Sequence, residues 1–220
     1  MFRPNEIISI DSTPELDGVR LRKEGSVMDP REQFEQVSEI LTGLVDGTRS
    51  DQLALATPCS DFTVRDLIGH LTLGRFLFAA GFAGDADRSA ELIASMPQHL
   101  GDVLGSDHHA TYHEATAAIN SAAAGVGDLE STVSLIFGEM PAGYALQLLS
   151  SDNLVHCWDL ACATGQDFNP AGELVDLTAE FFSSFISEDA RAGGMFGPEV
   201  EVAGDASSLD KMLAFCGRQP

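Results

Sequence analysis

The chain has 220 residues, of which 44% are hydrophobic, so it is long enough for one globular domain with a substantial core or for two small ones. Its 34 acidic residues against 12 basic ones give a net charge of −22, which excludes the positive surface that nucleic acids and anionic membranes require. The sequence also lacks the roughly 20-residue apolar run of a membrane span and the apolar segment of a secretory signal. We therefore expect a cytoplasmic protein that binds neither nucleic acid nor membrane.

The chain begins with a segment of weak periodicity. Residues 1–29 are expected to form a loosely ordered leader, followed by a single domain over residues 30–220. Apolar side chains recur every three or four positions over residues 30–45, which predicts the first helix. A second helix is expected to begin after Thr63, because Thr63 and Asp66 have the spacing of a capping box.

The rest of the chain is also predicted to be mainly helical. The expected elements, in chain order, are a weak helix over residues 92–100, a helix over 109–124, an extended segment over 132–137, a helix that has Pro141 at its first position and ends before Gly165, and helices over 172–187 and 207–215. Because helices dominate and their connections are short, we expect an all-α fold built as an antiparallel bundle.

The four cysteines have the spacing of neither a zinc-binding nor a disulfide-rich protein. Cys59, Cys157, Cys162 and Cys216 form no C-x-x-C pair, and they are few for a chain of this length. Reduced and mostly buried thiols are expected. Cys59 lies just before a predicted helix, where the helix dipole is expected to lower its pKa.

Polar residues interrupt the apolar face of the helix predicted over residues 141–164. At about 100° per residue, Asp152, His156 and Asp159 fall on the same face as Leu148 and Val155. Two carboxylates and an imidazole on a core face are costly unless they pair with one another or bind an ion.

A metal ion would remove that cost. Asp152 and His156, four residues apart, offer two ligands, and His70 on another helix is the candidate for a third. Asp159 is then expected to orient the site from outside the ligand set. Three protein ligands leave positions for water or substrate, as in catalytic sites. Zinc suits such a set best, and nickel, iron or manganese accept similar ligands.

Three simpler interpretations stay open at this point. His70 alone fits a core histidine with satisfied hydrogen bonds, and Asp152 with His156 fits a buried hydrogen-bonded pair. His109 and His113 form a rival pair with the same spacing, although their acidic surroundings favour a solvated surface.

Several segments together resemble the actinobacterial metal-binding family related to the N-terminal domain of mycothiol-dependent maleylpyruvate isomerase, within the DinB-like (YfiT-like) superfamily. The matching segments are TPCSDFTVRDLIGHL at 57–71, FGEMPAG at 137–143, DNLVHCWDLACATGQ at 152–166, FGPEVEV at 196–202 and LDKMLAFCGRQP at 209–220. The resemblance implies a DinB-like up-down four-helix bundle with additional short C-terminal helices. It also implies a divalent metal ion on a ligand pattern that falls on His70, Asp152 and His156.

The resemblance implies a function as well. It favours a metal-dependent transferase or isomerase that uses a low-molecular-weight thiol such as mycothiol as cosubstrate and acts on a small electrophile. The alternatives are a hydrolase that uses metal-activated water, a non-catalytic metal-binding or stress-associated module, and a helical interaction domain without an ion. The isomerase itself has Glu in place of Asp152, and its larger C-terminal domain has no match here. A monomer or a homodimer is expected.

Overall fold

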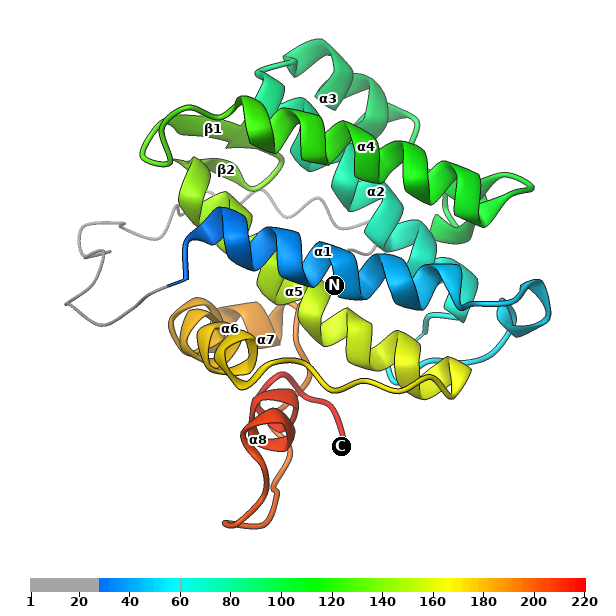
Figure 1. The fold of residues 1–220 in the computed structure, drawn as a ribbon, viewed down its shortest axis with the longest axis vertical. Helices are drawn as coiled ribbons and strands as arrows, with labels where there is room; N and C mark the ends of the chain where they lie inside the picture. The colour runs from blue at the N-terminus through cyan, green and yellow to red at the C-terminus, as the bar shows by residue number, and fades with distance from the viewer. Residues whose placement is uncertain (1–27, 60) are drawn as a thin grey trace.

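The computed structural model describes residues 28–59 and 61–220, so all but the last two residues of the predicted leader lie outside it. In chain order, the elements are α1 (Pro30–Asp46), η1 (Ser50–Gln52), α2 (Val64–Ala83), α3 (Ala86–Ala94), η2 (Leu100–Leu104), α4 (His108–Gly125), β1 (Thr132–Leu135), β2 (Gly138–Pro141), α5 (Ala142–Thr164), α6 (Gly172–Phe185), α7 (Glu188–Ala192) and α8 (Ser208–Phe215). Helices α1, α2, α4 and α5 lie side by side as a bundle, and α6, α7 and α8 follow it toward the C-terminus (Figure 1). The predicted all-α bundle with short C-terminal helices is confirmed.

Local sequence signals set the ends of the bundle helices. The Asp29 carboxylate accepts a hydrogen bond from the Arg31 N–H and so caps α1, which begins with a proline. Thr63 and Asp66 form the expected capping box at the start of α2. Gly165 ends α5 with a φ of 71°, a conformation that most side chains resist. These signals fix the start of α2 and the end of α5, the two helices that carry the predicted site residues.

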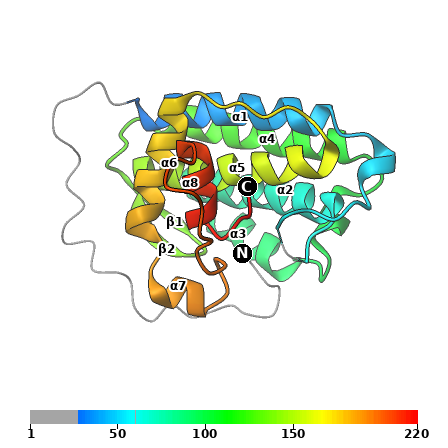
Figure 2. The same cartoon turned by 90° about the horizontal axis from the view of Figure 1, so that it is seen from below.

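The chain direction in the bundle depends on a crossover. The Arg65 guanidinium at the start of α2 donates to the Gly105 carbonyl just before α4, so α2 and α4 begin at the same end of the bundle. Segment α3–η2 connects the two helices and packs against α2. Figure 2 shows α3 beside α2, outside the four bundle helices. η2 packs so closely on α2 that a β-carbon at Gly69 would collide with the backbone of Leu100. Gly69 thus allows close packing directly beside His70.

The structure differs from the predicted α-helices and strands at several places. The weak helix expected over residues 92–100 is instead α3, because Asp85 caps a helix that begins at Ala86 and ends at Ala94. The extended segment continues into an unpredicted partner, β2, and forms an antiparallel hairpin. Ser187, expected at the end of a helix, instead caps the short unpredicted α7. Pro141 stands just outside α5 rather than at its first position.

Apolar side chains from all four bundle helices fill the interior between them. The contacts lie mainly between α2 and α4, between α1 and α5, and between α2 and α5. Buried side chains in these contacts include Leu41, Leu67, Ile68, Ile119, Leu146, Leu154 and Leu160. Among the described helices, none has both the length and the apolar character of a membrane span.

Candidate metal centre

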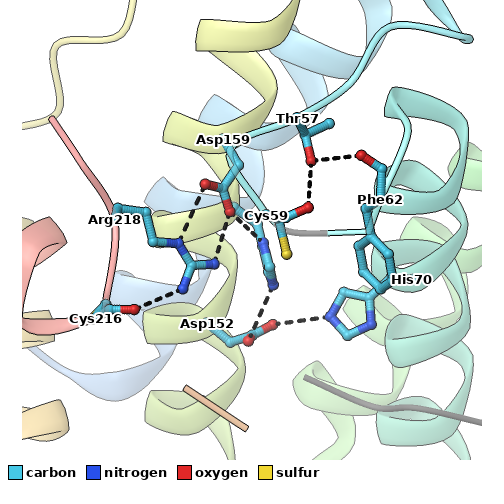
Figure 3. Close-up of polar contacts among 9 residues, drawn as sticks. Thr57, Cys59, Phe62, His70, Asp152, Asp159, Cys216 and Arg218 are labelled. Atoms are coloured by element: carbon cyan, nitrogen blue, oxygen red, sulfur yellow. Dashed lines mark hydrogen bonds and ion pairs between the residues drawn. The ribbon is translucent and has the colours of Figure 1, made fainter. Parts of the chain in front are cut away.

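Helices α2 and α5 bring the predicted site residues together. His70 lies on α2, and Asp152, His156 and Asp159 lie on successive turns of α5. The close-up view shows the Asp152 carboxylate pointing toward His70 (Figure 3). The side chains of His156 and Asp159 are 6% and 0% exposed, whereas that of Asp152 is 41% exposed. The expected core position therefore holds for His156 and Asp159, but Asp152 lies where the site opens to solvent.

The distances from the Asp152 carboxylate to the two imidazoles fit a shared ion. The Asp152 carboxylate lies between two imidazoles, with one oxygen 3.7 Å from His70 Nε2 and the other 3.5 Å from His156 Nε2. Both distances exceed those of ordinary N–H···O hydrogen bonds. Two ligand atoms about 2.1 Å from a tetrahedral zinc ion lie about 3.4 Å apart, close to both separations. The residues present therefore fit a divalent metal, with Nε2 as the ligand atom of each imidazole.

Asp159 sets the orientation of the His156 ring. One oxygen of its carboxylate lies 2.9 Å from His156 Nδ1. Burial by itself would raise the pKa of Asp159, but the hydrogen bond from His156 and the charge of Arg218 outweigh burial and lower it. A charged carboxylate can only accept hydrogen bonds, so His156 Nδ1 carries a hydrogen and donates a hydrogen bond to Asp159. His156 Nε2 then faces Asp152 and the open side of the site, where it is the ring atom available to a metal ion.

The electrostatics of the other two side chains favour metal-binding protonation states. Burial lowers the pKa of His70, although Asp152 opposes that shift, so the imidazole is neutral at neutral pH. Burial alone would raise the pKa of Asp152, but His156 and His70 outweigh it and hold this pKa well below its usual range. A neutral imidazole and a charged carboxylate are the forms that bind divalent ions.

Cys59 does not have the expected reactive character. Its side chain is 2% exposed, and burial, followed by the charge of Asp159, raises its pKa to about 12. The predicted lowering of its pKa is wrong, because desolvation outweighs any benefit of the nearby helix start. Cys59 also forms a possible ligand cluster with His156 and Asp159. Both Asp159 oxygens, however, already accept hydrogen bonds, which makes this cluster the poorer metal site.

The rival histidine pair is used in helix packing. His109 Nε2 lies 3.1 Å from the Val45 carbonyl oxygen at the end of α1. His113 Nε2 lies 2.8 Å from a carboxylate oxygen of Asp46. The neighbouring His108 is buried. His109 and His113 each face a separate partner on α1 rather than a shared ion.

All four cysteines are free, and only Cys162 is exposed.

Two side chains beside the site were not predicted from the sequence. Arg218, near the C-terminus, pairs with Asp159, and the Phe62 ring lies 5.8 Å from the ring of His70. A buried carboxylate such as Asp159 implies a cationic partner. Pattern alone does not select which of the 12 basic residues supplies it.

Comparison with known proteins places the chain in a family. The family model of the mycothiol maleylpyruvate isomerase N-terminal domain matches residues 34–161, more than half of the chain. The chain belongs to this family. The matched part of the chain contains His70, Asp152, His156 and Asp159. Arg218 lies beyond it.

Similar proteins extend the likeness over most of the chain. The uncharacterised proteins MT0763 and Rv0738, from two strains of Mycobacterium tuberculosis, are each 29% identical over 192 residues, which cover 87% of this chain and 98% of theirs. The crystal structure of a mutant mycothiol-dependent maleylpyruvate isomerase matches with a TM-score of 0.56 at 12% identity, over 80% of this chain and 78% of that one. The isomerase thus shares the fold of this chain.

Proposed function

We propose that the chain binds one divalent metal ion through His70 Nε2, His156 Nε2 and the Asp152 carboxylate, and uses it in thiol-dependent transfer or isomerisation of a small electrophile. The observation that carries the proposal is the convergence of these donor atoms from two helices, all within 4.8 Å of one another. Zinc is the ion that such ligands favour.

The open side of the site supports a catalytic rather than a structural ion. Structural zinc sites are closed by four protein ligands, whereas catalytic sites keep a position free. The side chain of Asp152 is 41% exposed, and the predicted set has three protein ligands. A small molecule could therefore reach the ion beside Asp152.

The thiol chemistry rests on the family. When bound, a divalent ion lowers the pKa of a thiol that it binds, so the nucleophilic thiolate forms at neutral pH. The chain's own residues would hold the ion, and Asp159 would keep the lone pair of His156 aimed at it. The same open position also admits water, so metal-assisted hydrolysis is the second candidate.

The first experiment measures metal content by mass spectrometry on protein purified without a metal-affinity tag. We expect about one equivalent of metal in the parent and none in H70A or H156A, because each variant removes one of three ligands. H113A is the matched control, since His113 pairs with Asp46 away from the site and should keep its metal. Stoichiometric metal in H156A, or none in a folded parent supplied with zinc or nickel, would contradict the proposal.

Cobalt substitution then separates the two candidate chemistries. Mycothiol should change the visible spectrum of the cobalt-loaded protein if its sulfur binds the ion, and S-methylated mycothiol should not. An unchanged spectrum on adding mycothiol would exclude the thiol-dependent reaction and leave hydrolysis as the better candidate.

A further inference from the structure

The C-terminal arginine makes a forked contact with the candidate metal centre. Arg218 Nη2 lies 2.9 Å from one oxygen of Asp159, and its Nε lies 3.3 Å from the other. The remaining terminal nitrogen donates to the carbonyl of Cys216 at 3.0 Å. Paired nitrogens on both carboxylate oxygens restrict rotation of the carboxylate as well as neutralising its charge.

The backbone before Arg218 is shaped to make this contact. After α8 ends, Gly217 adopts a φ of 82°, which most residues resist. A β-carbon at Gly217 would also lie 2.9 Å from the Cα atom of Gly197. This turn at Gly217, which packs closely against Gly197, brings Arg218 back against α5, where the close-up view shows it beside Asp159 (Figure 3).

One carboxylate oxygen of Asp159, Oδ2, accepts the two shortest hydrogen bonds that this side chain makes. Oδ2 accepts from His156 Nδ1 and from Arg218 Nη2, each at 2.9 Å. Asp159 is fully buried, so water does not replace a lost partner at that side chain. Removal of the guanidinium would leave a buried charge that must turn toward another donor. The His156 ring, hydrogen-bonded to that carboxylate, would move with it.

We propose that Arg218 is a positioning residue for the metal centre, acting on His156 through Asp159. The inference rests on the proposed metal site and adds that the segment after α8 sets its affinity. The centre then depends on three separate parts of the chain: α2, α5 and the C-terminal segment. Partners that orient a metal-bound histidine typically change metal affinity 10- to 100-fold when they are lost.

The test compares the zinc dissociation constants of the parent, R218M, R218K and R191M, measured on the full-length protein by competition with a chromophoric chelator. We expect R218M to weaken zinc binding by roughly 10- to 100-fold. R218K, which keeps the positive charge but has a single donor nitrogen, should recover part of the loss. The visible spectrum of bound cobalt should shift in R218M, because the geometry of one ligand changes.

R191M is the matched control. The Arg191 guanidinium donates to the carbonyl of Phe215 at 2.8 Å, so it ties down the same C-terminal segment without contacting Asp159 or His156. R191M should bind zinc like the parent. Equal weakening in R191M and R218M, or zinc affinity in R218M equal to that of the parent, would overturn the positioning role.

The two proposals fail in different ways. If the parent binds no metal, the proposed function is contradicted. If the parent and R218M bind zinc with the same dissociation constant, only the role of Arg218 is contradicted. Circular dichroism confirms that each variant is folded before its affinity is compared. If R218M does not fold, R218Q replaces it, since Gln is uncharged but keeps one hydrogen-bond donor.

Discussion

Arg75 on α2 has no solvent exposure, although it carries a charge. One of its terminal nitrogens donates to the Ser38 hydroxyl at 3.2 Å, and its guanidinium lies 5.0 Å from the centre of the Tyr112 ring. Its other two nitrogens have no hydrogen-bond partner within the described part of the chain. A buried cation without a carboxylate partner lowers the stability of the fold, because the free-energy cost of removing the guanidinium from water exceeds the stabilisation from one hydroxyl and one aromatic ring.

Replacing Arg75 with a neutral side chain of similar length is therefore expected to stabilise the bundle. R75M should raise the free energy of unfolding by about 1–2 kcal/mol, measured by urea denaturation at pH 7. The matched control is R88M, which removes a surface ion pair with Glu91 and should change stability by less than about 0.5 kcal/mol. A loss of 1 kcal/mol or more in R75M would show that the cation has a compensating partner.

The residues of the candidate site were predictable to different degrees. Asp152, His156 and Asp159 stand out because helical spacing alone places them on one face. His70 required the added argument that an ion needs a ligand from a second helix. Arg218 was not predictable, because its contact with Asp159 joins positions 59 residues apart through a turn that no local pattern specifies.

At the scale of elements, the capping box of α2 lies close to the candidate site. Asp66 accepts hydrogen bonds from the N–H of Thr63 and from the N–H of Gly101 at the start of η2. Burial alone would raise the pKa of Asp66, but the hydrogen bond from the Thr63 hydroxyl, followed by the two backbone hydrogen bonds, outweighs burial and lowers this pKa. Asp66 thus joins the start of α2 to the crossover that packs beside His70.

This lowered pKa predicts how stability depends on pH. A carboxyl group with a lower pKa in the folded state stabilises the protein above its unfolded pKa of about 3.9, and the gain disappears as the pH falls. D66N should therefore cost about 1 kcal/mol at pH 7 and much less near pH 3. Thermal unfolding at both pH values measures the difference, with D87N on exposed α3 as control. An equal cost at both pH values would contradict the assigned role.

The elements that the sequence predicted well have strong local signals. α1, α2 and α5 begin or end at Asp29, Thr63 and Gly165, whose side chains or backbone freedom act within one turn. β2 was not predicted, because Gly138–Pro141 is too short and too mixed to show alternation without its partner strand. The boundaries of α3 were also displaced, since its capping residue lies among several acids of similar appearance.

At the scale of the molecule, a bound ion would join α2 to α5 across the bundle. Ligands that bind only the folded state stabilise it by about 2.7 kcal/mol at a free concentration one hundred times Kd. Zinc should therefore raise the melting temperature of the parent, and a chelator should reverse the rise. The net charge of −22 also attracts divalent ions without specificity, so H70A is the necessary control. An equal rise in H70A would mean that surface acids, not the site, cause it.

The placement of the site along the chain has a consequence for the lifetime of the folded protein. Asp152, His156 and Asp159 meet as soon as α5 forms, whereas His70 and Arg218 reach them only after long loops of chain have closed. An ion held by His70 together with Asp152 and His156 would find its ligands complete only once α2 and α5 have met, and we expect this contact to form after the folding barrier. Its binding energy would then be missing from the transition state, so the metal would slow unfolding and leave the folding rate almost unchanged.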